Sequence, residues 1–273
     1  MGENIHVVEN DQIRYFTIPF FDRTNKVITA FSTRLGGYSR EPYKSLNLSY
    51  SVGDEKDKVK LNRELLCNHL GIEVKQLVAG AQVHNATVEK VSIVHRGRGA
   101  LEYETAISSV DAMVTNEKGV PLIGIFADCV PIYLFDPINE AIGLVHSGWR
   151  GTCLGISKKA INSLVNNYGC NPKDIIAAIG PSIGPCCFEV DNKVVDIFKE
   201  SIVDVNKHMI KVSHDKWKVS LWDIIERQMI ECGLNRDNII NFNLCTSCKK
   251  ELFFSYRREG NPSGRMATLL MLK

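Results

Sequence analysis

Residues 112–146 read AMVTNEKGVPLIGIFADCVPIYLFDPINEAIGLVH. Four short apolar runs stand out in this segment, at 112–115, 121–127, 130–135 and 141–145. Short apolar runs bounded by polar and turn-forming residues, such as the pair Asp136-Pro137, predict strands. Because these runs are almost continuously hydrophobic, we expect both faces of the strands to be covered. The segment is therefore predicted to form the centre of a buried sheet.

The sequence on either side of this segment mixes further strands with helices. Apolar residues with a 3.6-residue period predict helices at 54–70, 154–168, 191–200 and 220–232. Gly71 and Gly169 end the first two, and Ser220 caps the last. Strands are expected at 27–33, 175–179 and 265–272, and one long strand or a hairpin at 77–94. Strict βαβ alternation is missing, so we predict an α+β fold with mixed sheets and helices packed outside, in a single domain spanning 1–273.

Composition excludes several classes of protein. The chain has 273 residues, and 33 Lys+Arg against 31 Asp+Glu give a net charge of +2. A charge this small predicts neither nucleic acid nor a membrane surface as a partner. The polar first residues predict no signal peptide, and no apolar run reaches the ~18 residues of a membrane helix. Nine cysteines, an odd number, suggest reduced thiols and a cytoplasmic location.

Polar residues that could perform chemistry lie where the predicted strands end. They are His84, Asp128, Cys129 and His146. Two histidines and one cysteine match a catalytic zinc site, in which three protein ligands leave a fourth position open. The gaps of 45 and 17 residues do not by themselves require a metal, and each residue alone could be an ordinary packed side chain. Asp128 is harder to dismiss, because a carboxylate inside an apolar run must be paired, ligating or titrating.

Arginines near glycines are candidates for binding an anion. Arg34 precedes Leu35-Gly36-Gly37, Arg150 lies between Trp149 and Gly151, and Arg257, Arg258 and Arg265 lie near Gly260 and Gly264. Exposed backbone N–H groups and guanidinium forks together suit phosphate. The chain lacks the P-loop, Rossmann, GxSxG and HExxH patterns.

The remaining cysteines give weaker signals. Cys245 and Cys248 have CxxC spacing without a second CxxC, so we interpret them as structural or as an adventitious metal pair. For the adjacent Cys186 and Cys187, packing is the default interpretation, because neighbouring cysteines rarely bridge one another.

Several motifs together resemble one known family. They are TRLGG at 33–37, SLNL at 45–48, QVH at 82–84, ADCVPI at 127–132, VHSGWRGT at 145–152, IGPSIGPCCFEV at 179–190, and the tail with CTSC at 245–248, SYRR at 255–258 and GR at 264–265. In order and in type, these resemble the YfiH/YlmD family, which has been labelled laccase domain or polyphenol oxidase and is described as purine nucleoside phosphorylases. The resemblance runs from about residue 33 to the C-terminus.

The resemblance implies a fold, a metal and an activity. The implied fold is the CNF/YfiH-like layered sandwich, and the implied metal is Zn²⁺ on His84, Cys129 and His146, with Cu²⁺ as a substitute. The implied reactions are phosphorolysis of adenosine, inosine, guanosine and methylthioadenosine, and deamination of adenosine. Nucleosides and phosphate are then the partners. On this basis we expect Arg34 and Arg150 to bind phosphate, Asn47 to bind the nucleoside, and Asp128 to orient a ligand or relay a proton.

Three other functions compete with this one. A zinc-free cysteine hydrolase would use Cys129 as nucleophile and His146 or His84 as base. Some relatives are described as peptidoglycan editing factors, which would make a cell-wall precursor the substrate. A multicopper laccase needs about eight histidines, usually in HxH pairs, around its coppers. The chain has seven histidines and no HxH, which disfavours that function.

Overall fold

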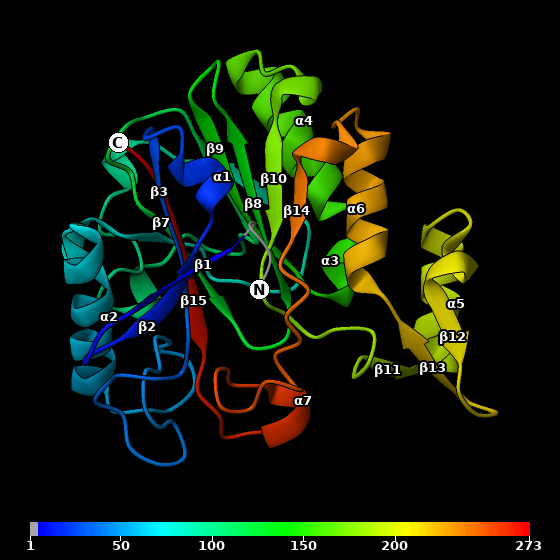
Figure 1. Cartoon of the computed structure of the whole chain (residues 1–273), viewed down its shortest axis with the longest axis horizontal. Coiled ribbons are helices and arrows are strands. Elements are labelled where there is room, and N and C mark those ends of the chain that lie inside the picture. The colour runs from blue at the N-terminus through cyan, green and yellow to red at the C-terminus, as the bar shows by residue number, and fades with distance from the viewer. Residues whose placement is uncertain (1–4) are drawn as a thin grey trace.

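The computed structural model describes residues 5–273. Two large sheets and one small sheet form its framework (Figure 1). The first large sheet has the strand order β1-β2-β3-β15-β7-β4. Its strands are β1 (His6–Glu9), β2 (Arg14–Thr17), β3 (Val27–Ser32), β15 (Met266–Leu272), β7 (Leu122–Phe126) and β4 (Val78–Ala79). All neighbours are antiparallel except β4 and β7, which run parallel.

The second large sheet is built around the central apolar segment, and a small third sheet follows it. The second sheet has the order β14-β10-β8-β9-β6-β5 and the third β11-β13-β12. The strands of the second are β5 (Val88–Lys90), β6 (Ala112–Thr115), β8 (Val130–Asp136), β9 (Ala141–Ser147), β10 (Ile176–Ile179) and β14 (Ile239–Asn241). Those of the third are β11 (Glu189–Asp191), β12 (Met209–Lys211) and β13 (Lys216–Val219).

Helices cover the outer faces of the two large sheets (Figure 1). The longer helices are α2 (Lys56–Leu70), α4 (Ile156–Tyr168), α5 (Asn192–Ser201) and α6 (Leu221–Glu231). The short ones are α1 (Pro19–Asp22), α3 (Trp149–Cys153) and α7 (Tyr256–Glu259), with 3₁₀ turns at Val74–Gln76, Ile93–His95, Tyr103–Thr105, Pro172–Asp174, Val205–His208 and Arg236–Asn238. In the described part of the chain, no helix combines the length and apolar character needed to cross a membrane.

The period-2 alternation of the strands explains the layers. In β8, Tyr133 and Phe135 face the first sheet, whereas Ile132 and Leu134 belong to the core beneath α4 and α6. The Tyr133 hydroxyl donates a hydrogen bond across the sheet interface to the carbonyl oxygen of Ala30, over 2.8 Å. Strands buried on both faces read as apolar runs. The predicted α+β class, with mixed sheets and outer helices, is confirmed.

Most predicted elements appear within two residues of their expected bounds. Gly71 and Gly169 both take the left-handed conformation that ends α2 and α4. The Ser220 side chain accepts the backbone N–H of Asp223 at the start of α6, as its capping position predicts.

The prediction of one long strand or a hairpin at 77–94 is wrong. Only β4 and β5 are strands there, and they belong to different sheets. The carboxylate of Asp111 accepts the backbone N–H groups of Val83, His84 and Asn85 over 3.3, 3.0 and 2.9 Å. These N–H groups therefore cannot donate to a neighbouring strand. His84 also has a φ of 60°, outside the strand region. The segment is a loop that crosses between the sheets, and its valine at 83 is exposed.

Candidate metal centre and cavity

The structure brings together His84, Cys129 and His146 from three segments. His84 lies on the loop between β4 and β5, Cys129 on the turn between β7 and β8, and His146 near the end of β9. Their potential ligand atoms all lie within 4.8 Å of one another. Cys129 Sγ is 3.8 Å from His84 Nδ1, and the two imidazole rings are 4.9 Å apart. We refer to these three residues as the histidine–cysteine centre.

Asp111 fixes the orientation of two of the three. His146 Nδ1 lies 2.9 Å from Oδ1 of Asp111, so Nε2 is the ring nitrogen left for Cys129 or a metal. The same carboxylate holds the His84 loop through the backbone N–H groups described above. A carboxylate behind a ligating histidine fixes its tautomer and strengthens it as a ligand.

The centre has a strong internal electrostatic coupling. Burial by itself raises the pKa of the Cys129 thiol, but the charge of His146 and hydrogen bonds from both histidines outweigh it and lower that pKa to about 6. Burial opposes the protonated form of His146, yet the Cys129 thiolate and the bond to Asp111 raise its pKa to about 9. Cys129 is therefore held as a thiolate, which is the form that binds metals.

The donor set and its surroundings fit a zinc ion. Two imidazole nitrogens and one thiolate are ligands of catalytic zinc, and copper accepts similar donors. The backbone of Gly148 passes directly beside the donors. A Cβ at that position would lie 3.0 Å from His84 Nδ1 and 3.1 Å from Cys129 Sγ. A glycine therefore keeps the space next to the ligand atoms free.

The histidine–cysteine centre lies in a cavity of about 600 Å³ with a positive lining. Four arginines line it, namely Arg63, Arg150, Arg257 and Arg265. Asp128 is the sole lining carboxylate within residues 5–273. A concave site with this excess of guanidinium groups attracts anions.

Asp128 lines the cavity, but its carboxylate is already saturated with hydrogen bonds. Oδ1 accepts the hydroxyl of Thr246 over 2.6 Å, and Oδ2 accepts the hydroxyl of Ser255 over 3.0 Å and the backbone N–H of Arg257 over 2.7 Å. Its backbone oxygen accepts the N–H of Ile183 over 2.9 Å. Asp128 therefore holds the C-terminal loops against the turn that carries Cys129.

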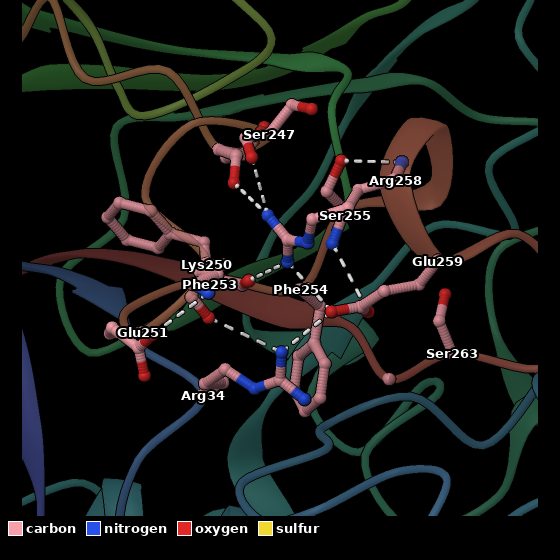
Figure 2. Close-up of polar contacts among 12 residues, drawn as sticks. Arg34, Ser247, Lys250, Glu251, Phe253, Phe254, Ser255, Arg258, Glu259 and Ser263 are labelled. Carbon is pink, nitrogen blue, oxygen red and sulfur yellow. Dashed lines mark hydrogen bonds and ion pairs between the residues drawn. The ribbon is translucent and has the colours of Figure 1, made fainter.

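The other predicted site residues are placed differently. Arg150 lines the cavity, with its guanidinium 4.5 Å from the ring centre of Trp149. Arg34 does not line it. Figure 2 shows the Arg34 guanidinium pointing toward Glu259, and the two form an ion pair of 2.7 Å. The same guanidinium lies 4.4 Å from the ring centre of Phe254.

Asn47 is also outside the cavity and is fully buried. Its amide donates hydrogen bonds to the carbonyl oxygen of Ser49 and the carboxylate of Asp54. Its Oδ1 accepts the backbone N–H of Arg265 over 2.9 Å. Asn47 thus positions an arginine of the cavity rather than facing the cavity itself.

Sequence reasoning missed one residue of this site, Asp111. Asp111 could have been noticed, because it is a carboxylate directly before an apolar strand, as Asp128 is after one. Arg257 and Arg265 were among the arginines considered for anion binding, but only Arg34 and Arg150 were assigned to phosphate. The guanidinium of Arg265 donates to the carbonyl oxygens of Ser263 and Gly264 over 2.8 and 2.9 Å, which fixes it at the cavity wall.

Comparison with known proteins connects this site to a family. A family model described as "Multi-copper polyphenol oxidoreductase laccase" matches residues 28–273. The chain is 35% identical over 253 residues to "Purine nucleoside phosphorylase YlmD" of Bacillus subtilis (strain 168), covering 92% of this chain and 91% of that protein. It is 34% identical over 251 residues to "Adenosine deaminase RL5" of an unknown prokaryotic organism, covering 91% and 95%.

A solved structure shows the same fold. The crystal structure of the Bacillus licheniformis hypothetical protein YfiH superimposes with a TM-score of 0.93 and 32% identity, covering 98% of this chain and 99% of that one. The family model, the sequence match and the fold therefore agree, and the chain belongs to the YfiH/YlmD family, whose family model is described as multi-copper polyphenol oxidoreductase laccase.

Proposed function

We propose that this protein is a zinc-dependent purine nucleoside phosphorylase with adenosine deaminase activity. Its substrates are adenosine, inosine, guanosine and methylthioadenosine together with phosphate. The observation that carries the proposal is the histidine–cysteine centre in a cavity lined by four arginines. The names of the relatives, a phosphorylase and a deaminase, support both reactions. We also propose that residues 1–273 act as one domain, in the cytoplasm, where nine free cysteines stay reduced.

Phosphorolysis needs an anion held next to the sugar. A phosphate oxygen forms the bond to C1′ while the C1′–N9 bond breaks, and its electron pair leaves with the purine, which takes up a proton. Arg150, Arg257 and Arg265 are suited to bind the phosphate, because guanidinium forks pair with its oxygens in bidentate fashion. Asn47 and Arg34 act as positioning residues behind the cavity wall. Asn47 accepts the backbone N–H of Arg265, and Arg34 forms an ion pair with Glu259.

His84, Cys129 and His146 would hold the zinc ion. A zinc ion with three protein ligands supplies a Lewis acid that makes water acidic near neutral pH. In deamination, a water oxygen bonds to C6 of adenosine and the C6–N bond breaks, with a proton passing to the departing ammonia. Gln82 keeps the His84 loop in place, since its side-chain amide pairs with both backbone groups of Ile125 over 3.0 and 2.8 Å.

A cysteine hydrolase is a second candidate, because the pKa of Cys129 is lowered to about 6 beside His146. Such an ion pair activates thiol nucleophiles. This function predicts full activity after removal of metal and complete loss after thiol alkylation. The zinc enzyme predicts that a chelator abolishes activity and that zinc restores it.

The decisive experiment is incubation with adenosine and phosphate, followed by product analysis. Adenine reports phosphorolysis, inosine reports deamination, and hypoxanthine reports both in series. His84→Ala and Cys129→Ala should lose turnover together with their zinc. The matched controls are His214→Ala, at an exposed histidine, and Cys232→Ala, a half-buried cysteine outside the cavity. Full turnover in either cavity variant refutes the zinc mechanism.

A further inference from the structure

A second group of potential metal ligands lies outside the cavity, on two loops that are far apart in sequence. Cys186 and Cys187 follow β10, and Cys245 and Cys248 follow β14. Their four sulfur atoms all lie within 4.8 Å of one another. Cys248 Sγ lies 3.5 Å from Cys186 Sγ and 3.4 Å from Cys187 Sγ. We call this group the four-cysteine cluster.

The spacing of the sulfur atoms suits one central ion. Zinc binds thiolates at about 2.3 Å in a tetrahedron, which puts neighbouring sulfurs about 3.8 Å apart. The two shortest sulfur–sulfur distances, 3.4 and 3.5 Å, lie slightly below this value, and all the others are within 4.8 Å. A disulfide accounts for the arrangement less well, because Cys248 is equally close to two partners and can bond only one of them.

Core packing does not explain the cluster either. Cys186 and Cys248 are exposed, Cys187 is half-buried, and only Cys245 is buried. Buried cysteines behave as small apolar side chains, but exposed ones gain nothing from packing. Because two of the four thiols are exposed to solvent, their clustering needs an explanation other than packing.

The backbone around the cluster supports a thiolate at Cys245. The N–H of Gly184 donates to Cys245 Sγ over 3.3 Å. Hydrogen bonds of this kind favour the charged form of the sulfur, which is the ligating form. Gly184 also has no room for a side chain, since a Cβ would lie 2.8 Å from the Trp222 ring and 3.3 Å from Cys186 Sγ.

We propose that the four-cysteine cluster is a structural zinc site, with all four thiolates binding one Zn²⁺. A closed set of four sulfur ligands leaves no position for substrate, in contrast to the three donors of the histidine–cysteine centre. The cluster thus differs in role as well as in place.

The zinc site clamps together two loops, and the one that follows β10 supplies Ile183 and Phe188 to the wall of the cavity. The loops already meet through the N–H of Ser182 on the carbonyl oxygen of Leu244, over 3.2 Å, and the N–H of Thr246 on the carbonyl oxygen of Ser182, over 3.0 Å. Thr246, between the two cysteines of the CxxC turn, donates to Asp128, the neighbour of Cys129. A bound ion at the cluster therefore fixes the position of Asp128 from behind.

Two arginines complete this connection. Arg257 donates from Nη1 to the carbonyl oxygen of Cys187 over 3.0 Å and lines the cavity. Arg258 donates from Nη1 to the carbonyl oxygens of Thr246 and Ser247 over 2.9 and 2.8 Å, and Figure 2 shows its guanidinium pointing at the turn. The CxxC turn is thus bound from one side by an arginine and from the other by the proposed ion.

Zinc counting on the full-length protein tests the site. The wild type, loaded with zinc and desalted, should hold about two zinc ions per chain. Cys129→Ala should keep about one, held by the cluster, and Cys248→Ser should keep about one, held by the histidine–cysteine centre. The variant with both changes should hold none. Cys186→Ser is a second variant at an exposed position, and Cys232→Ser, outside both sites, should retain both ions.

Two further readouts separate the outcomes. Cobalt added to metal-free Cys129→Ala should give the thiolate charge-transfer absorption of a tetrahedral four-sulfur site. In the variant that also carries Cys248→Ser, this absorption should be weaker. A chelator should lower the Tm of Cys129→Ala but not that of the double variant. The proposal is overturned if reduced Cys129→Ala binds no zinc, or if mass spectrometry finds Cys248 in a disulfide in the freshly purified protein. Because the cluster is counted in a variant without the histidine–cysteine centre, the result does not depend on the proposed function.

Discussion

His146 donates a hydrogen bond from Nδ1 to Oδ1 of Asp111 over 2.9 Å, and both residues are buried. The same carboxylate accepts three consecutive backbone N–H groups of the loop that carries His84. The pKa of Asp111 is lowered, because hydrogen bonds to His146 and to this loop outweigh the effect of burial. One side chain thus sets the position of two proposed ligands.

Replacing this carboxylate should weaken metal binding. We expect Asp111→Asn to lower zinc affinity at the histidine–cysteine centre by about 10–100-fold, because the amide no longer orients His146 as a charged acceptor. Competition with a chelating dye measures the affinity. Asp136→Asn is the control, since Asp136 is an equally buried carboxylate at the far end of β8. Equal affinities in the two variants would contradict the role of Asp111.

A methyl group at position 148 should disturb the same centre by crowding. Gly148→Ala places a Cβ 3.0 Å from His84 Nδ1 and 3.1 Å from Cys129 Sγ, and these atoms must move apart to accept it. We expect loss of zinc from this centre with a Tm close to that of the wild type, because the φ of −75° suits alanine. Gly143→Ala, where a Cβ would meet atoms at 3.4 Å, serves as the control. Unchanged zinc content in Gly148→Ala would show that His84 and Cys129 do not bind an ion together.

The arginines of the cavity should determine the KM for phosphate rather than the KM for the nucleoside. Arg257→Met and Arg150→Met should each raise the KM for phosphate by about 10-fold, since a hydrogen bond to a charged group contributes about 1.5–3 kcal/mol. The KM for inosine should change much less. Arg236→Met is the control, because Arg236 is exposed and pairs with Glu226 outside the cavity. Steady-state kinetics with each substrate varied in turn would refute the assignment if the nucleoside KM rose instead.

Asp136 should make the free energy of unfolding depend on pH in the acidic range. Burial alone raises the pKa of Asp136, but hydrogen bonds from Asn139, Cys170 and Ile138 outweigh it and hold that pKa below its ordinary value of 3.8. A carboxyl group with a lowered pKa stabilises the folded state fully above the unfolded pKa and loses this contribution as pH falls through the folded pKa.

Asp136→Asn should therefore lower the free energy of unfolding by about 1–2 kcal/mol at pH 7, and the difference from wild type should shrink below about pH 4. Urea titrations at pH 7, 5 and 3.5 measure it. Asp237→Asn, at an exposed position, should be indistinguishable from wild type throughout. A difference that grows as pH falls would reverse the sign and refute the interpretation.

Much of the fold could be predicted from local pattern. Helices such as α2 and α4 have their period, their apolar face and their terminal glycine all within one short segment. The segment at 77–94 was mispredicted because its valines have strand propensity, whereas the hydrogen bonds that decide its path come from Asp111, more than 20 residues away. Strand propensity depends on neighbouring residues, whereas an acceptor that competes for the backbone N–H groups can come from a distant part of the chain.

By itself, the sequence determined the class of the fold, the likeness to one family, and a short set of metal-ligand candidates. It could do so because periodicity, glycine positions and motifs are properties of neighbouring residues. Only the tertiary structure decided which side chains share a site. It placed Arg34 on Glu259, buried Asn47 behind Arg265, and brought Cys186 and Cys187 to Cys245 and Cys248. Such distances are fixed by the packing of sheets and loops from distant parts of the chain, and no local pattern records them.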